Sequence, residues 1–267
     1  MESTKLAKNI RKLALRMVSE AKASHIGSAL SIADIIAVLY AEILSVDPLD
    51  PKGISRDRFI LSKGHACVAV YAALAEKGFI THDSLQTYGQ DGSWLMNHIS
   101  HKVRGVEFST GALGHGLSFG VGKALAAKQQ SNSWRTFVLL SDGEMDEGSN
   151  WEALMFAAHH KLENLIGIID YNKLQSLQTV EKTVNLEPLS EKLSAFGCAF
   201  VTVDGHDHAE LARALSSTTK NKPKVVIANT IKGKGVSFME NQVAWHYKSP
   251  NEEELQRALT DIEASDA

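Results

Sequence analysis

Two short polar segments, each at the end of an apolar run, carry the residue types that bind a divalent cation. The run 137–140 leads into Asp142 and Gly143, and the run 165–169 leads into Asn172. One carboxylate, one amide oxygen and a nearby backbone carbonyl make a hard oxygen set. Mg²⁺ is usually held by one or two such protein groups, with the phosphates of a bound ligand completing its shell. The two segments therefore indicate a magnesium site for a phosphorylated ligand.

The two apolar runs have the character of buried parallel strands, because they are short, rich in β-branched residues and bounded by turn-forming residues. A helical pattern over residues 150–161 separates them, which predicts a βαβ crossover that brings the two strand ends side by side. Open α/β sheets bind their ligands at this carboxyl edge. The alternative is that residues 141–143 form an ordinary turn and that Asn172 caps the end of its strand.

The remaining pattern predicts an α/β protein. Three further apolar runs, separated by helical segments, have strand character: residues 58–62, 199–203 and 224–231. Such alternation is typical of a three-layer α/β/α fold with a mostly parallel central sheet. Residues 23–30 predict a small-residue loop around His25, and Ser31 is a suitable N-cap for a helix over residues 32–44. No linker or repeat divides the sequence, so residues 1–267 are expected to form a single domain.

Composition places the chain among ordinary globular proteins. Hydrophobic residues make up 44%, charged residues 22%, and the net charge is −3 with both signs mixed, which excludes the basic footprint of a nucleic-acid-binding protein. No signal-peptide pattern and no apolar run of membrane-spanning length is present, so a cytoplasmic protein is expected. Cys67 and Cys198 lie far apart in apolar contexts and are expected to be buried, reduced thiols. The polar tail 264–267 is expected to be a natural chain end.

Four histidines stand in predicted loops: His25, His65, His98 and His246. Taken singly, each is more typical of a surface or capping histidine than of a catalytic one. Two glycine-rich segments are also ambiguous. Segment 109–123 lacks the Gly-Lys-Ser/Thr ending of a P-loop, and its glycines suit close helix packing as well. Lys232-Gly-Lys-Gly235 fits a solvated turn or a ligand-facing loop equally well.

Together, these segments resemble the N-terminal half of a transketolase. The motifs that carry the resemblance, in this order, are Ser24-His25-Ile-Gly27, Leu61-Ser-Lys-Gly-His65, Ser109-Thr-Gly-Ala-Leu-Gly-His-Gly116, Ser141-Asp-Gly143 and Lys232-Gly-Lys-Gly235. Asp142-Gly143 followed by Asn172 is similar to the diphosphate-binding signature of thiamin diphosphate enzymes, with Ser141 in place of its first glycine. The resemblance covers nearly the whole chain and implies the thiamin diphosphate-binding fold, specifically its pyrophosphate domain.

This resemblance implies thiamin diphosphate and Mg²⁺ as cofactors. The metal ligands would be Asp142, Asn172 and the backbone carbonyl of Leu174. Gly143 would make a close backbone contact with the cofactor, while Gly111 and Leu113 would lie against its aminopyrimidine ring.

The resemblance also assigns roles to the loop histidines. His65 and His246 would border the pyrophosphate and the thiazolium ring, and His25 and His98 would face the oxygens of the donor sugar. Histidine suits this position because it donates or accepts a proton near neutral pH. Tyr247 departs from the pattern, since the family commonly has glycine there.

The activity implied is transfer of a two-carbon ketol unit from a ketose phosphate to an aldose phosphate, with the pentose phosphate pathway as the default setting. The chain ends where a full transketolase continues into a pyrimidine-binding and a C-terminal domain, and no glutamate here matches the one that activates the cofactor. Either the chain is the N-terminal subunit of a split transketolase, working with a C-terminal subunit in a heterotetramer, or it is a fragment. Residues 146–148 and Glu152 match positions at the subunit interface of the family.

Two other functions remain open. The α subunit of a 2-oxo acid dehydrogenase shares the cofactor and the Asp–Asn motif, although the His25 and His65 segments argue against it. A non-catalytic scaffold subunit that kept the cofactor fold is the alternative from a different class. A protein that binds partner and cofactor without turnover would support that reading.

Overall fold

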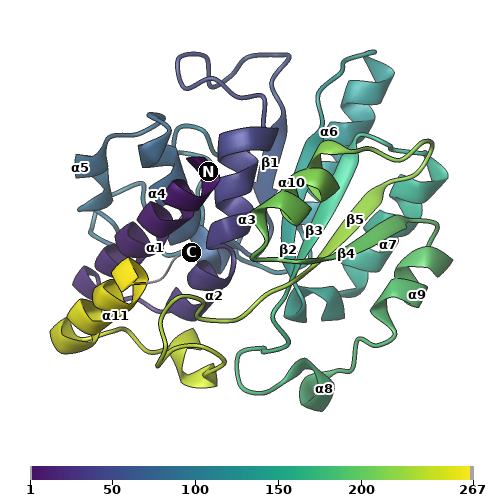
Figure 1. Cartoon of the computed structure of the whole chain (residues 1–267). Coiled ribbons are helices and arrows are strands. Elements are labelled where there is room, and N and C mark those ends of the chain that lie inside the picture. The colour runs from purple at the N-terminus through teal and green to yellow at the C-terminus, as the bar shows by residue number, and fades with distance from the viewer. Residues whose placement is uncertain (1, 265–267) are drawn as a thin grey trace.

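The computed structural model describes residues 2–264, so residue 1 and most of the expected polar tail, residues 265–267, lie outside the described part. Five parallel strands form one sheet in the order β1-β2-β3-β5-β4 (Figure 1). Their bounds are Arg58–Leu61 (β1), Thr136–Ser141 (β2), Leu165–Tyr171 (β3), Ala199–Asp204 (β4) and Lys224–Asn229 (β5). The predicted α/β class is confirmed, and every strand pair in this sheet is parallel.

Helices cover both faces of the sheet (Figure 1). On one face, the hydrophobic core contains residues of α1 (Glu2–Glu20), α2 (Ile26–Ser31), α3 (Ala33–Val38), a π-helical turn (Leu39–Ile43), α4 (Cys67–Glu76), α10 (His208–Ser216) and α11 (Glu252–Ala264), and α11 reaches it by packing on α1. The other face packs against α6 (Gly116–Gln129), α7 (Gly148–His159) and α9 (Leu189–Ala195). Short elements complete the described residues: α5 (His82–Leu85), α8 (Val180–Thr183) and the 3₁₀ turns Gly64–Ala66, Gly143–Asp146 and Val243–His246.

Successive residues of a central strand enter opposite cores, which explains why the strands are apolar throughout. In β2, Phe137 and Leu139 belong to one hydrophobic cluster, and Val138 and Leu140 belong to the other. A sheet buried on both faces needs apolar side chains at the residues that point to each face. Edge strand β4 lacks this constraint, and its Phe200 is 43% exposed.

The predicted helix over residues 32–44 corresponds to α3 and the π-helical turn, which together run from Ala33 to Ile43, but the assignment of Ser31 as its N-cap is wrong. Helix α2 already begins at Ile26, α3 follows after a break at Ile32, and Ser31 is a buried helical residue. The small residues of this segment serve close packing rather than a loop: a Cβ on Gly27 would lie 3.3 Å from Lys232 Cγ. His25 is therefore the residue that precedes a helix, and it has a left-handed backbone with φ of 74°.

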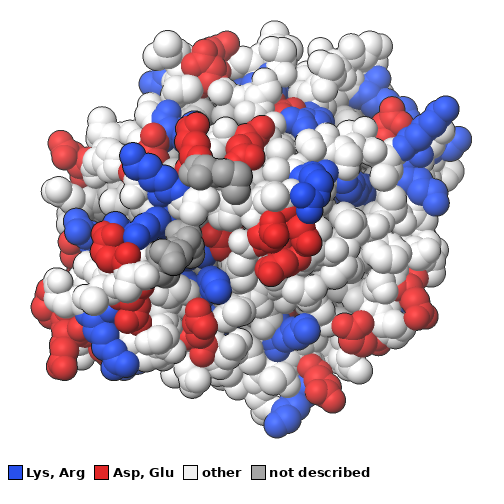
Figure 2. All heavy atoms as spheres, viewed as in Figure 1, with Lys and Arg blue, Asp and Glu red and all other residues white. Residues whose placement is uncertain are grey.

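The structure also describes the surface charges, the two cysteines and the lengths of the helices. Basic and acidic side chains are intermingled over the face in Figure 2, with neither sign gathered into one field. Cys67 and Cys198 are buried and unpaired. Within residues 2–264, no helix combines the length and the apolar character needed to cross a bilayer.

Candidate active site

All ten predicted site residues line one cavity of about 270 Å³ at the carboxyl edge of the sheet. They are His25, His65, His98, Gly111, Leu113, Asp142, Gly143, Asn172, Leu174 and His246. Its walls also include Ser28, Ser141, Gln175, Ser176, Lys232 and Tyr247. Segments distant in the sequence meet here because the strands are parallel and end at the same edge.

Asp142 is a buried carboxylate whose hydrogen bonds come from backbone groups. It follows β2 directly, is 1% exposed, and accepts from the backbone N–H groups of Gly143 at 2.7 Å and Lys173 at 2.6 Å. Burial and the nearby charge of Asp170 raise the pKa of Asp142 to about 7. A carboxylate that is costly to ionise in these surroundings suits a site where a cation supplies the compensating positive charge.

Asn172 and Leu174 present the other two predicted metal ligands. The Asn172 amide donates to Asp170 Oδ2 at 3.0 Å, which turns its Oδ1 toward the Leu174 N–H, 3.1 Å away. The Leu174 carbonyl accepts from Lys232 Nζ at 3.0 Å. Residues 2–264 hold no cluster of three or more His, Cys, Asp or Glu side chains able to bind a metal, and the predicted set contains only one such side chain.

Asp170 orients Asn172 from beneath the cavity. It is fully buried and bonded to Lys63 Nζ at 2.5 Å, to the Ser31 hydroxyl at 2.7 Å and to the hydroxyl of Thr230. Burial alone would raise the pKa of Asp170, but the charge and hydrogen bond of Lys63 bring it below its usual value. The ionised Asp170 therefore fixes the Asn172 rotamer and also opposes ionisation of Asp142.

Lys232 lines the cavity, although the sequence pattern fitted a solvated turn and a ligand-facing loop equally well. Its side chain is buried, and its ammonium donates to the carbonyls of Leu174 at 3.0 Å and Gln175 at 3.1 Å. His246 Nδ1 lies 3.0 Å away. Burial, with the charge of Lys63, lowers the pKa of Lys232 to about 8. The interpretation of this segment as a solvated turn is therefore wrong. In the sequence, the only local indication of a buried lysine here is its position between a strand and two glycines.

The four predicted histidines form one group in the lining of the cavity. The ring of His25 has its centroid 5.1 Å from His65, 5.9 Å from His98 and 5.1 Å from His246. His65 Nε2 lies 3.0 Å from the Ser28 hydroxyl, and the backbone N–H of His25 donates to the His246 carbonyl at 2.8 Å. Tyr247 adds an exposed ring beside them, 6.2 Å from His25 and 4.7 Å from His246.

Burial and nearby positive charges favour the neutral imidazoles of His25, His65 and His246. Burial, followed by the charges of His98, Lys232 and Lys63, lowers the pKa of His25 to about 4. Burial and Lys232 lower that of His246 to about 3, and burial with Lys63 holds that of His65 well below its usual value. At neutral pH each of these three rings offers one donor and one acceptor nitrogen, which suits hydroxyl and carbonyl oxygens of a substrate.

The shifted pKa of His25 predicts a pH-dependent difference in stability between the chain and its His25→Asn variant. Asparagine tolerates the left-handed backbone at this position. Between pH 6.5 and about 4 the unfolded histidine binds a proton that the folded one does not, so acid destabilises the wild type relative to the variant. Urea unfolding of both proteins from pH 7.5 to 4.5 measures this difference. Parallel pH profiles would show that His25 titrates normally.

Glycines bring the segment that precedes α6 close to the sheet edge. A Cβ on Gly116 would lie 2.3 Å from the Ser62 hydroxyl, and one on Gly111 would lie 3.3 Å from the His98 ring. Larger residues at these two positions would push the segment away from the cavity. The absence of a side chain at these glycines therefore both allows the close packing and places the cavity-lining residues.

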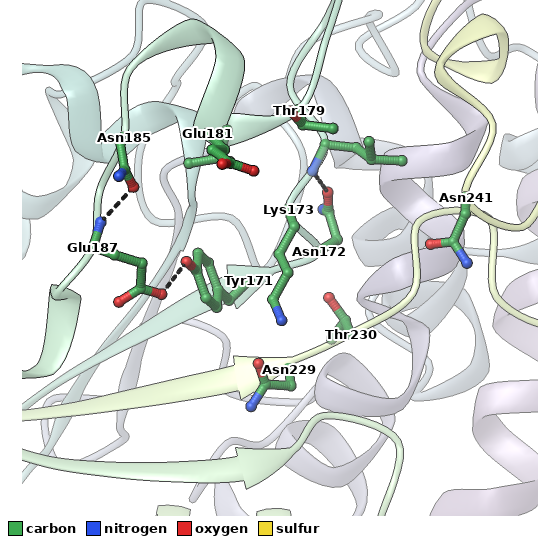
Figure 3. A pocket seen from close by; sticks show the side chains of 12 residues that line it. Tyr171, Asn172, Lys173, Thr179, Glu181, Asn185, Glu187, Asn229, Thr230 and Asn241 are labelled. Carbon is green, nitrogen blue, oxygen red and sulfur yellow. Dashed lines mark hydrogen bonds between the residues drawn. The ribbon is translucent and has the colours of Figure 1, made fainter.

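A second cavity of about 610 Å³ lies on the other side of the Asn172–Leu174 segment (Figure 3). Figure 3 shows the Lys173 side chain pointing into it, between Asn229 and Thr230. Tyr171 forms part of its wall and bonds to Glu187 at 2.5 Å. Asn172 and Leu174 thus line both this cavity and the histidine cavity.

Comparisons with known proteins agree with this geometry. Residues 2–262 match the family described as "Transketolase, thiamine diphosphate binding domain". An apulose-4-phosphate transketolase subunit of Phocaeicola vulgatus is 42% identical over 254 residues, 94% of this chain and 90% of that protein. The 6-deoxy-6-sulfo-D-fructose transketolase subunit SqwG of Clostridium sp. is 39% identical over 97% of this chain and 95% of its own length.

Solved structures give the same answer for the fold. Transketolase from Campylobacter jejuni superposes with a TM-score of 0.92 at 30% identity, and the match covers 98% of this chain and 42% of that one. The chain thus spans less than half of a solved transketolase but nearly all of the two subunits named above. It belongs to the transketolase family, within the part that binds thiamin diphosphate.

Proposed function

We propose that this chain is the cofactor-binding subunit of a Mg²⁺-dependent transketolase that transfers a two-carbon ketol unit between sugar phosphates. The observation that carries the proposal is the convergence of all ten sequence-predicted residues on one cavity. The match of one transketolase domain to residues 2–262 supports treating the chain as a single domain.

The residues of the cavity fit Mg²⁺ and a diphosphate group. Asp142 Oδ, Asn172 Oδ1 and the Leu174 carbonyl would hold the metal, and Lys232 would release that carbonyl to meet a phosphate oxygen instead. His65 and His246 would border the diphosphate and the thiazolium ring, with Gly143 close to the diphosphate. When bound, thiamin diphosphate supplies the electron sink that lets the carbon–carbon bond beside a ketose carbonyl break and re-form.

The chain's own task in the reaction would be orientation and proton handling. The Ser24 hydroxyl lies 3.2 Å from His25 Nδ1, which leaves Nε2 of His25 for the substrate. His25 and His98 would hold the donor's hydroxyl and carbonyl oxygens and move a proton as the bond changes. Gly111 and Leu113 would flank the aminopyrimidine ring.

A second subunit would complete the enzyme. Two similar proteins are named as subunits of their transketolases, and this chain spans 42% of the Campylobacter jejuni enzyme. The partner would supply the pyrimidine-binding and C-terminal domains in a heterotetramer, and residues 146–148 with Glu152 would lie at the contact. The family match and the two named transketolase subunits favour a transketolase subunit over the α subunit of a 2-oxo acid dehydrogenase.

The substrates of the similar proteins extend the set of donors to test. One is named for apulose 4-phosphate and another for 6-deoxy-6-sulfo-D-fructose, while xylulose 5-phosphate is the donor of the pentose phosphate reaction. Ketol transfer from each donor to an aldose phosphate is measured with Mg²⁺ and thiamin diphosphate. The chain is assayed by itself and together with a subunit that carries the remaining transketolase domains.

The expected result is activity with the mixture and none with either protein by itself. Activity of this chain by itself would contradict the requirement for a partner. A complex that binds the cofactor and stays inactive with every donor would instead favour the scaffold role.

A further inference from the structure

A buried charged cluster lies outside the cavity and the roles described above do not use it. The Asp34 carboxylate accepts hydrogen bonds from Arg11 Nη1 at 3.0 Å, from His206 Nδ1 at 2.7 Å and from His208 Nε2 at 3.1 Å. The side chains of Arg11 and Asp34 are only 2% and 3% exposed. Burying charges is costly even when they are paired, so the cluster calls for an explanation beyond packing.

Side chains of this cluster form hydrogen bonds with the backbone on both sides of Lys232. The N–H of Ile231 donates to His206 Nε2 at 2.9 Å, and Arg11 Nε donates to the Lys234 carbonyl at 3.2 Å. The loop is also tied to α2, because the Gly233 N–H donates to the Gly27 carbonyl at 3.0 Å. One side chain of the cluster therefore holds the residue before Lys232, and another holds the second residue after it.

Asp34 determines which nitrogen of His206 is free to accept. Since the Ile231 N–H donates to Nε2, the His206 proton must be on Nδ1, where it is donated to Asp34. Burial alone would raise the pKa of Asp34, but Arg11 and the two histidines hold it well below its usual value. An ionised Asp34 thus fixes the tautomer that anchors Ile231.

We propose that Asp34 and His206 are positioning residues that place the Lys232 ammonium in the cofactor cavity. The inference rests on the proposed role of Lys232 toward the diphosphate. The Lys232 ammonium reaches three acceptors, on Leu174, Gln175 and His246, within 3.0–3.1 Å. Such a position depends on the backbone that carries the lysine. Without the Ile231 anchor the loop gains freedom, and a shift of about 1 Å at a functional group has large consequences.

A double-mutant cycle on cofactor affinity tests this coupling. Binding of thiamin diphosphate with Mg²⁺ is titrated by calorimetry to the two-subunit complex carrying His206→Phe, Lys232→Met or both. Each single substitution is expected to weaken binding by about 10- to 100-fold, as loss of an orienting partner does at metal sites. The double variant is expected to bind no more weakly than Lys232→Met, because His206 acts through the lysine.

Two further variants separate positioning from general stability. His208→Gln disturbs the same Asp34 oxygen pair but touches no backbone of the Lys232 loop, so cofactor affinity should stay within about twofold. His206→Gln keeps an acceptor near the Nε2 position and should bind more tightly than His206→Phe. Additive losses in the cycle, or equal losses for His208→Gln and His206→Phe, would overturn the proposal.

A measurement without cofactor keeps the inference separate from the proposed activity. The rate at which acetic anhydride modifies Lys232, followed by mass spectrometry, should rise in folded His206→Phe and not in His208→Gln. An unchanged rate in His206→Phe would overturn the positioning role. If Lys232→Met binds cofactor normally but the rate rises as expected, the proposed diphosphate contact is wrong and the positioning role stands.

Discussion

Replacing Asp142 with asparagine is expected to abolish cofactor binding without unfolding the chain. The substitution removes the single carboxylate among the predicted metal ligands, so the affinity for Mg²⁺ and thiamin diphosphate should fall by more than about 100-fold, the upper range for residues that only orient a ligand. Ketol transfer should be lost to the same extent. Calorimetric titration of the two-subunit complex measures the affinity, and the ketol-transfer assay measures the activity.

The stability of the same variant should change little, for a specific reason. Burial and Asp170 raise the pKa of Asp142 to about 7, so an ionised carboxylate is unfavourable there without a cation. The amide removes this repulsion and gives up one backbone hydrogen bond worth about 1 kcal/mol. The melting temperature should therefore move by no more than about 4 °C. Asp261→Asn is the control, since this carboxylate accepts from Ser237 at the surface. A variant that keeps cofactor affinity would show that the metal lies elsewhere.

Loss of the buried Lys63–Asp170 ion pair is expected to cause the largest change in stability. Both side chains are 0% exposed, with Lys63 Nζ 2.5 Å from Asp170 Oδ2. Lys63→Met leaves the Asp170 charge buried without its cation, so the free energy of unfolding should fall by about 3–5 kcal/mol. Urea denaturation at pH 7 measures it. Because Asp170 orients Asn172, cofactor affinity should fall in the same variant.

The matched control is Lys77→Met at the surface. Lys77 Nζ lies 3.6 Å from Glu2, and the two side chains are 29% and 76% exposed, so its removal should cost less than about 1 kcal/mol. The double variant Lys63→Met/Asp170→Asn removes the orphaned charge and should regain part of the lost stability. If the double variant is no more stable than Lys63→Met, the buried charge is not the cause of the loss.

The sheet and the positions after its strands could be predicted because their signals are local. Buried strands such as β2 and β3 are apolar at every position, and parallel strands all present their last residues at one edge. The proximity of Asp142 and Asn172 can therefore be predicted from the sequence alone. The histidines needed the family resemblance, because nothing in a short segment shows that His25 and His246 meet.

The errors have tertiary causes. Residues 26–31 carry small side chains that are typical of loops, yet close contact with the Lys232 loop makes the same side chains suitable for a buried helix. The sequence around Lys232 is typical of a solvated turn. Its burial is explained by hydrogen bonds of its ammonium group to Leu174 and His246, which lie in other segments of the chain. The His206–Asp34 contact joins residues whose sequence separation is 172, and no periodic pattern reports such a pair.

The two ends of the described chain interlock, and this has a consequence for synthesis on the ribosome. Helix α1 packs beside α11 (Figure 1), the Ser19 hydroxyl donates to the Pro250 carbonyl 231 positions away, and the His25 N–H donates to the His246 carbonyl. Among the described elements, α1 is synthesised before the strands of the sheet, and its packing partner α11 is synthesised after them. The amino-terminal segment must therefore wait, incompletely packed, while the sheet forms. A nascent chain can assemble its histidine cavity only after translation has passed His246, so the cavity cannot bind a cofactor before that point.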